Sequence, residues 1–301
     1  MKSRLKVVGL GELLWDMLPS GKQLGGAPAN FAYMTSLLGH QAIVASRVGH
    51  DPPGEEAVAR LKRLGLAIEY LQFDREHPTG TVAVRLDAQG LPSFTISEAV
   101  AWDFLDWTPA WAELASEADV VCFGTLAQRH ARSRQTIRQF LQAAPASALK
   151  IFDVNLRQSF FGAEVLAESL PLSQIVKLNH EELPVVCRLL GLACKDEESG
   201  ARQLLRRYHL KLVCITRGAG GSLIVDPDVT SSHPGFCVKA VDTVGSGDAF
   251  TACLAHHYLR GASLEEINAA ANRLAAWVAS QLGGTPALNG RTLEDVLPSV
   301  E

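Results

Sequence analysis

The alternation of short apolar runs with longer segments of helical pattern constrains this fold more than any other feature. The apolar runs are rich in β-branched residues and lie at 6–9, 42–45, 119–123, 149–152 and 212–215. The segments of helical pattern lie at 28–39, 54–65, 131–143, 180–191 and 198–208. Strands that are apolar on both faces are typical of parallel sheets covered by helices on both sides. The alternation therefore predicts an α/β fold with a mostly parallel central sheet.

Two segments interrupt this alternation. Residues 12–19 are apolar but follow the first strand too closely to be a crossover helix, and 79–97 has the pattern of a β-hairpin around 87–90. We expect these two segments to form a small β-sheet that projects as a lid. The core would then consist of 1–11, 20–78 and 98–301, and an ordinary hairpin at the sheet edge is the alternative. The C-terminal third predicts strands within 211–238, then helices at 246–260 and 263–282.

Composition narrows the class of protein. The chain has 301 residues, 47% hydrophobic and 20% charged, which excludes a disordered chain. A chain of this length buries about three quarters of its surface, so the core needs no disulfide or metal. The net charge of −4 gives no electrostatic reason to expect nucleic acid or an anionic membrane as partner. Six cysteines without a CxxC pair, and no apolar run suited to a bilayer, predict reduced thiols in a cytoplasmic protein.

The most informative motif lies at 240–250. Gly245, Ser246 and Gly247 precede a predicted helix, and Asp248 falls in its first turn. Small residues leave backbone N–H groups free to converge on an anion, and the helix N-terminus adds positive partial charge. A carboxylate beside such a phosphate site can accept a proton from an attacking hydroxyl. The alternative is that Asp248 is an ordinary N-terminal helix residue.

Four further motifs place polar or glycine residues beside predicted strands and helices. The segment Gly25-Gly26-Ala27-Pro28-Ala29-Asn30 opens a helix, so it is either a sugar-contacting loop or a turn with a cap. Asn179 and Glu182 follow a strand, where Asn179 could also be a helix cap. The other two motifs also follow strands. A glycine-rich turn at 215–221 could hold a nucleotide or merely join two strands. In the segment 153–157, Arg157 could bind phosphate or form a salt bridge with an acidic side chain at the surface.

Two other kinds of site are disfavoured. Gly9-Leu10-Gly11 lacks the third glycine and the following helix of a dinucleotide-binding fingerprint, which argues against a nicotinamide dehydrogenase. The histidines show no HExxH pattern, and we interpret His256-His257 as a packed or solvated pair.

Together these motifs resemble the ribokinase-like (PfkB) family of sugar kinases, most closely its bacterial fructokinase-like members, over nearly the whole chain. The resemblance implies a three-layer sandwich, with a mostly parallel sheet between helices and a small β-sheet lid. It also implies ATP-dependent phosphoryl transfer to a primary hydroxyl of a small sugar, with fructose as first choice. Alternatives are 2-keto-3-deoxygluconate, another ketose or a nucleoside as acceptor, or a non-catalytic, kinase-like interaction protein.

The resemblance also implies roles for individual residues. Asp248 matches the catalytic base, and its anion hole matches Gly245, Ser246 and Gly247. Arg157 resembles the arginine near the transferring phosphate. The positions that contact sugar in the family match Asp16, Gly25, Gly26 and Asn30.

Further positions match the family's nucleotide and ion sites. The positions linked to Mg²⁺ and phosphates match Asn179 and Glu182, the latter through water. The nucleotide-binding turn and the adenine contact match Thr216, Gly218, Gly221 and Asn272. A monovalent cation such as K⁺ would lie beside Asp242 and Gly284. Val154 and Gln158 depart from the family pattern, which often has prolines there.

The lid has a further consequence for assembly. Its segments are apolar at alternate positions, and only one face can lie against the active site. We expect the outer face to carry Leu14, Val82, Val84, Phe94 and Ile96. Such a face would be an exposed apolar patch unless it is covered, which predicts a two-fold homodimer joined through the lids.

Overall fold

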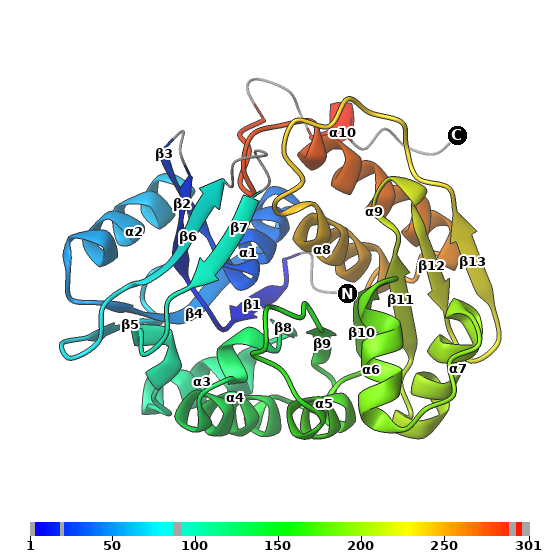
Figure 1. Ribbon diagram of the computed structural model, residues 1–301, viewed down its shortest axis with the longest axis horizontal. Coiled ribbons are helices and arrows are strands. Elements are labelled where there is room, and N and C mark those ends of the chain that lie inside the picture. The colour runs from blue at the N-terminus through cyan, green and yellow to red at the C-terminus, as the bar shows by residue number, and fades with distance from the viewer. Residues whose placement is uncertain (1–3, 19–20, 87–91, 289–292, 297–301) are drawn as a thin grey trace.

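A nine-stranded sheet forms the centre of the molecule (Figure 1). The computed structural model describes residues 4–18, 21–86, 92–288 and 293–296. The strand order is β13-β12-β11-β10-β9-β8-β1-β4-β5. The strands are β1 (Lys6–Leu10), β4 (Gln41–Gly49), β5 (Leu71–Asp74), β8 (Val120–Phe123), β9 (Leu149–Asp153), β10 (Ile175–Asn179), β11 (Leu212–Thr216), β12 (Ser222–Val225) and β13 (Thr230–His233). From β5 to β11 neighbours are parallel, whereas β12 and β13 are antiparallel, so the predicted α/β sheet is confirmed.

Helices cover both faces of this sheet. One face packs on α3 (Pro109–Glu117), α4 (Ala131–Ala143), α5 (Ala163–Ser169), α6 (Glu182–Leu190) and α7 (Glu197–Tyr208). The other packs on α1 (Ala27–Leu37), α2 (Pro52–Arg63), α8 (Ser246–Tyr258) and α9 (Leu264–Ala279), and the short α10 (Leu293–Val296) lies against α9. Successive strand residues belong to opposite cores, as Val7 and Val8 do, which confirms the three-layer sandwich. Within the described residues, no helix is long and apolar enough to cross a bilayer.

Helix α3 was not predicted from the sequence, although its start carries ordinary capping signals. Thr108 Oγ1 accepts a hydrogen bond from the Trp111 amide at 3.2 Å, and Pro109 occupies the first turn. Trp111 is buried against Phe140 of α4, with ring centroids 5.9 Å apart and rings perpendicular. The helix is short and its pattern weak, so packing on α4 rather than local periodicity sets it in place.

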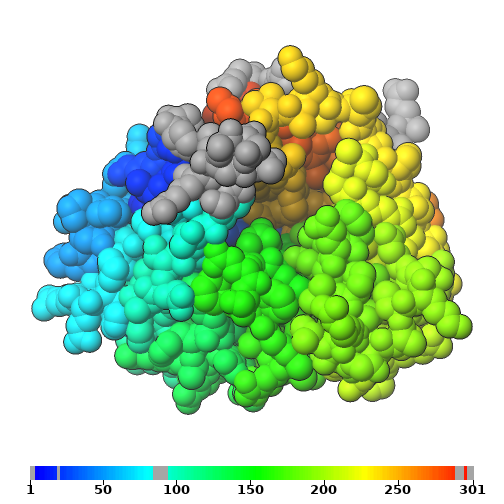
Figure 2. Space-filling model, viewed as in Figure 1, coloured from blue at the N-terminus to red at the C-terminus, as the bar shows by residue number. Residues whose placement is uncertain are grey.

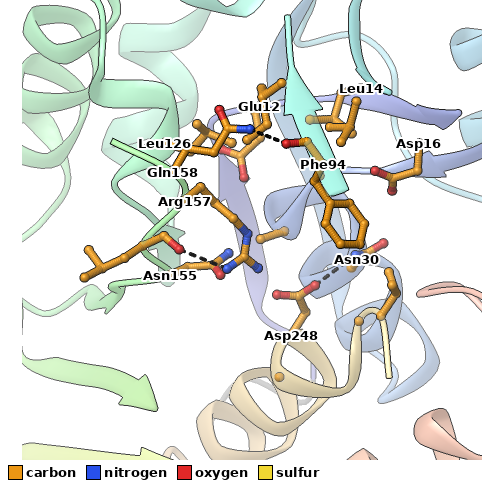
Figure 3. A pocket seen from close by; sticks show the side chains of 18 of the residues that line it. Glu12, Leu14, Asp16, Asn30, Phe94, Leu126, Asn155, Arg157, Gln158 and Asp248 are labelled. Atoms are coloured by element: carbon orange, nitrogen blue, oxygen red, sulfur yellow. Dashed lines mark hydrogen bonds between the residues drawn. The ribbon is translucent and has the colours of Figure 1, made fainter. Parts of the chain in front are cut away.

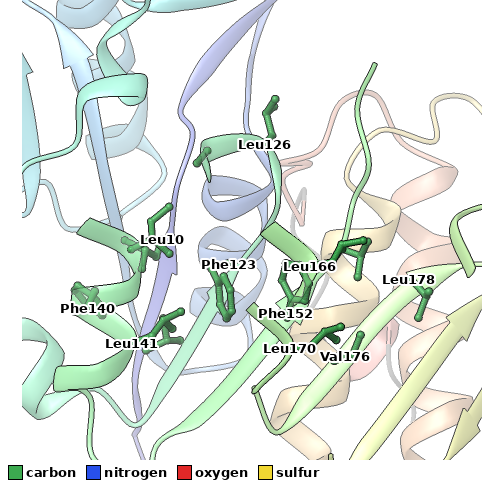
Figure 4. Packing of buried hydrophobic residues seen from close by; sticks show 14 of the residues in the cluster. Leu10, Phe123, Leu126, Phe140, Leu141, Phe152, Leu166, Leu170, Val176 and Leu178 are labelled. Carbon is green, nitrogen blue, oxygen red and sulfur yellow. The ribbon is translucent and has the colours of Figure 1, made fainter. Parts of the chain in front are cut away.

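Large aromatic side chains fill the core between the sheet and helices α3 to α6 (Figure 4). Phe123 of β8 and Phe152 of β9 stack with ring centroids 5.1 Å apart. Both are fully buried, as is Phe140 of α4. Burial of rings of this size is a large stabilising term, and it holds β8 and β9 in a fixed position beneath the functional cavity.

A second sheet lies apart from the first, with order β3-β2-β6-β7 (Figure 1). Its strands are β2 (Leu14–Leu18), β3 (Gly21–Gly25), β6 (Gly80–Leu86) and β7 (Pro92–Ile96). Strand β3 lies within 20–78, which the sequence analysis placed in the core. The small sheet therefore includes one strand more than the sequence indicated, because β3 pairs antiparallel with β2.

The faces of the small sheet differ from the expectation. Leu14, Val82 and Ile96 were expected on the outer face, but they are only 4%, 7% and 6% exposed and line the cavity described below. Phe94 also lines the cavity, although it is 55% exposed, and the side chain of Val84 lies outside the described ones. Alternation shows that two faces of a strand differ, but which face is covered depends on the docking of the whole sheet.

We predict that Phe152→Ala lowers the free energy of unfolding by about 3–5 kcal/mol, because it leaves a cavity beside Phe123 in a dry core. Phe73→Ala is the matched control, since Phe73 is 49% exposed, and we expect a loss of about 1 kcal/mol or less. Urea unfolding of both variants measures the difference. Equal losses would contradict this account of the core.

Candidate active site

A cavity of about 620 Å³ opens at the carboxyl ends of the central strands. Strand β1 lies between β4 and β8, so the strand order changes direction at β1. Open α/β sheets bind ligands at such a point, outside the carboxyl ends of the strands. In the space-filling view, blue and cyan N-terminal residues lie at left and yellow and orange C-terminal residues at upper right (Figure 2). Both parts contribute to the cavity, the first with residues between 12 and 96 and the second with residues between 243 and 248.

The N-terminus of α8 forms one wall of the cavity. Gly245 begins the helix with φ 77°, and a Cβ there would lie 2.4 Å from Gly284 Cα, so only glycine fits. Gly245, Gly247 and Asp248 line the cavity, whereas the Ser246 hydroxyl donates to Thr243 O at 2.8 Å. The N–H groups of a first helical turn have no partner within the helix. This wall therefore offers hydrogen-bond donors and positive partial charge to an anion.

Asp248 is held in place by a residue distant in sequence. Asn30 Nδ2 of α1 donates to Asp248 Oδ2 at 2.8 Å (Figure 3). Burial and then the nearby Asp153 carboxylate raise the pKa of Asp248 to about 6, although the Asn30 hydrogen bond opposes the rise. The carboxylate is thus mostly ionised at neutral pH and can accept a proton.

Asp16 faces the same cavity from β2. Burial and the Asp242 carboxylate raise the pKa of Asp16 to about 6. A Cβ at Gly25 would lie 2.2 Å from Asp16 Oδ2, so Gly25 makes room for this carboxylate. Gly26 lines the cavity with φ 106° and turns the chain into α1, which carries Asn30. The structure therefore brings together all four predicted sugar-contacting residues.

Glu12 was missed as a site residue. It is 3% exposed, lines the cavity, and its Oε2 has no hydrogen-bond partner among the described residues. Burial raises the pKa of Glu12 to about 7, and Asp248 contributes in the same direction. A carboxylate directly after a buried parallel strand was the available sequence signal.

Arg157 projects into the cavity from the loop after β9 (Figure 3). Its guanidinium opposes the burial-driven rise in the pKa values of Glu12, Asp16 and Asp248. Among the described residues it forms no ion pair, and Nη1 donates to Leu156 O at 3.1 Å. The surface salt bridge considered for Arg157 is therefore not observed, and its charge remains available to a ligand.

Lys177, also missed, lies beneath α8. Its Nζ donates to both carboxylate oxygens of Asp153 at 3.0 Å, and Thr251 Oγ1 donates to Asp153 Oδ2 at 3.0 Å. Burial alone would lower the pKa of Lys177, but Asp153, Glu182 and Asp248 raise it above its ordinary value. The cation is therefore neutralised by Asp153 and supports the floor of the cavity.

Asn179 and Glu182 lie outside the cavity lining. Asn179 Oδ1 accepts from the amides of Glu181 and Glu182 at 2.9 and 2.8 Å, so Asn179 caps the turn that leads into α6. The Glu182 carboxylate accepts from the amides of Leu156 at 2.7 Å and Asn179 at 2.8 Å. Each oxygen retains a lone pair, so a water molecule bound to Mg²⁺ would still find an acceptor.

The predicted nucleotide residues lie together at a different edge. Thr216, Gly218 and Gly221 belong to the turn between β11 and β12, closed by a bond from Arg217 N to Gly221 O at 2.7 Å. Asn272 of α9 is 6% exposed, and its Nδ2 donates to Ser222 Oγ at 2.7 Å. These four residues are thus joined through β12, but none lines the cavity.

The predicted cation residues lie on two loops that meet. Asp242 Oδ1 accepts from Val244 N and Oδ2 from Gly283 N, both at 3.0 Å. Gly284 then packs against Gly245. In the described part of the chain no group of three His, Cys, Asp or Glu side chains could hold a metal. A monovalent cation here would need backbone oxygens beside Asp242, and such hard oxygen donors fit it.

The chain matches the family model described as pfkB family carbohydrate kinase over residues 20–289. It belongs to the pfkB family of carbohydrate kinases. Fructokinase of Escherichia coli is 32% identical over 262 residues, which are 83% of each chain. An uncharacterized sugar kinase of Pyrococcus horikoshii, solved in complex with ATP, is 29% identical with a TM-score of 0.79, over 97% of this chain and 100% of that one. Fructokinase of Vibrio cholerae, solved with fructose, ADP and calcium ion, is 25% identical with a TM-score of 0.77, over 97% and 98%.

Membership of the pfkB family confirms the resemblance inferred from the motifs. It also excludes the dehydrogenase alternative, which the glycine pattern already disfavoured. The apolar side of this kinase's cavity was not predicted as such; it consists of Leu14, Val82, Phe94, Ile96 and Leu126. Gln128 and Arg129 lie outside this lining: Gln128 Nε2 donates to Ser169 Oγ at 3.0 Å, and Arg129 pairs with Asp103 at 2.7 Å.

We predict that Lys177→Met lowers the free energy of unfolding by about 3–5 kcal/mol, because Asp153 would be left as a buried, uncompensated charge. Lys22→Met breaks the exposed pair with Glu56 and should cost no more than about 1 kcal/mol. Thermal and urea unfolding of the two variants provide the comparison. A Lys177→Met protein as stable as Lys22→Met would refute the structural role of the buried pair.

Proposed function

We propose that this pfkB-family kinase transfers the γ-phosphoryl group of ATP to a primary hydroxyl of a small neutral sugar, with fructose as the preferred acceptor. The observation that carries the proposal is Asp248, an ionisable carboxylate in the first turn of α8, held by Asn30 inside the cavity. Relatives named fructokinase, and the fructose and ADP in one of the solved structures, support the choice of acceptor and nucleotide.

The geometry supports a simple mechanism. Asp248 accepts the hydroxyl proton as the sugar oxygen attacks the γ-phosphorus, and the bond to the β-phosphate oxygen breaks. The N–H groups of the α8 N-terminus and the Arg157 guanidinium stabilise negative charge on the transferring group. Glu182, oriented by its bond from the Asn179 amide, would hold Mg²⁺ through water, and the ion, when bound, would neutralise phosphate charge. A K⁺ ion beside Asp242 and Gly284 would strengthen the positive field at the same helix end.

The charge of the cavity supports a neutral acceptor over a sugar acid. Glu12, Asp16 and Asp248 line the cavity. Of the two cations in its described lining, Lys177 is paired with Asp153, and Arg157 has no acidic partner. A substrate carboxylate such as that of 2-keto-3-deoxygluconate would be repelled by the three acids and would compete with phosphate for Arg157. A non-catalytic interaction protein would have no use for an intact Asp248 and its cradle.

The homodimer through the small sheet stays a prediction with weaker support. Four of the side chains expected to form its interface line the cavity instead, namely Leu14, Val82, Phe94 and Ile96. On the opposite face, Met17 is an apolar side chain that is 44% exposed. The cytoplasmic location also stays a prediction; the six cysteines are free thiols, and four of them are buried.

We predict that Asp248→Asn lowers kcat by about 10²–10⁴-fold, because the amide keeps the contact to Asn30 but cannot accept the proton. ATP affinity should change little, since the α8 N–H groups remain. Steady-state kinetics with fructose, together with nucleotide titration, measure both. Near-normal turnover by the folded variant would remove Asp248 from the role of base.

The wild-type pH profile provides an independent measurement of the same assignment. The pKa of Asp248 is raised to about 6, so the ionised form is lost as the pH falls through that value. We therefore expect kcat/KM to decline below about pH 6. A profile flat down to pH 4 would contradict a carboxylate base with this pKa.

We predict that Asp16→Ala raises the sugar KM by about ten- to a hundredfold, the loss expected for hydrogen bonds from sugar hydroxyls to a charged group. The KM for ATP should remain within about twofold, since Asp16 lies on the small sheet rather than near the 216–221 turn. Separate titrations of the two substrates measure this split. An equal rise in both KM values would place Asp16 outside the sugar site.

A further inference from the structure

Arg157 lies on a tight turn with an unusual backbone. The turn spans 157–160 and is closed by a bond from Phe160 N to Arg157 O at 3.0 Å. Its second residue, Gln158, has φ 49°. A side chain in this left-handed region is unfavourable and persists when the surroundings demand it. Proline, with φ fixed near −65°, could not occupy this position.

The surroundings supply a contact that accounts for this conformation. Gln158 Nε2 donates to the backbone oxygen of Phe94 at 2.6 Å (Figure 3). Phe94 lies on β7, the edge strand of the small sheet, so its outward carbonyl is free of strand pairing. The Phe94 ring itself lines the cavity, as do Arg157 and Gln158.

The other end of the turn is tied to the same strand through Arg129. The Arg129 guanidinium lies 4.5 Å from the centre of the Phe160 ring and 4.1 Å from that of Trp102. Its Nη2 donates to Ser97 O at 2.5 Å, just after β7 ends. The Arg129 side chain is 7% exposed and paired with Asp103, whereas Gln158 is exposed, so we expect the Arg129 link to persist when the Gln158 link opens.

We propose that Gln158 is a positioning residue for phosphoryl transfer: its side chain ties β7 to the turn that carries Arg157, so that Phe94 and Arg157 close on the bound sugar as one unit. The inference rests on the function proposed above. The link from Arg129 to Ser97 acts as the pivot, and the Gln158 bond fixes the edge nearer the cavity. Closure by this unit excludes water, which would otherwise accept the phosphoryl group.

The size of the effect follows from the contact. One neutral, exposed hydrogen bond shifts an open–closed equilibrium by about three- to tenfold. Removing the Gln158 hydrogen bond should raise the sugar KM and lower kcat/KM for sugar by that factor. It should also let water compete with the sugar, so that more ADP than sugar phosphate is formed. ATP affinity should not change, because the predicted nucleotide residues lie at the other edge of the sheet.

The experiment compares three variants with wild type. Gln158→Met keeps the length of the side chain but has no donor, Gln158→Lys keeps a donor, and Ser159→Ala is the control at the neighbouring exposed position. For each we would measure both KM values, the ratio of ADP to fructose phosphate formed, and hydrogen–deuterium exchange of 92–97 and 157–160 with and without fructose.

We expect Gln158→Met to raise the sugar KM about three- to tenfold and to speed exchange in both segments together. Gln158→Lys should restore much of the wild-type sugar KM and of the slow exchange in the two segments. Ser159→Ala should match wild type in both measurements. Faster exchange with unchanged kinetics would reduce the contact to a structural role and overturn the proposal, as would no change in either. Wild type without sugar kinase activity would instead refute the proposed function, and the exchange data would still show whether Gln158 joins the two segments.

Discussion

The hydrogen bond between Asn30 and Asp248 is the interaction on which the arrangement of this site depends. It joins residues 218 positions apart, at the starts of α1 and α8, and it forms only because these helix ends pack closely. Glycines make that approach possible: a Cβ at Gly284 would lie 2.7 Å from the Asn30 amide, and one at Gly245 would meet Gly284. Close packing of the two helix ends thus allows the Asn30–Asp248 contact, and that contact orients the base beside the anion-binding wall.

Burial of charge then determines what this site can do. Three carboxyls with raised pKa values share one cavity, and the field of Arg157 limits the rise. Below the cavity, Lys177 and Asp153 neutralise each other, so the floor is stable without drawing on Arg157. The paired ions Lys177 and Asp153 therefore support the site, whereas the unpaired charged groups of the cavity remain available to a ligand.

The small sheet forms one boundary of the cavity. Its inner face is apolar, from Leu14, Val82 and Ile96, and covers one side of the cavity, while Asp16 adds a polar group on the same face. Trp15 on the opposite face is anchored to α2 through a bond from Nε1 to Pro53 O at 2.9 Å. One end of the sheet is therefore fixed to the core, and the edge strand β7 reaches across to the turn of Arg157.

The sequence by itself determined the α/β class, the pfkB family and the site motifs, because each is local: β-branched runs, glycine-rich turns and a carboxylate in a first helical turn. It also indicated Asp16, Asn30 and Asp248, which the structure brings to one cavity. Only the tertiary structure decided which face of the small sheet is buried and that Glu12 and Gln158 face the cavity. These depend on contacts between segments far apart in the chain, and neither periodicity nor spacing within a segment carries that information.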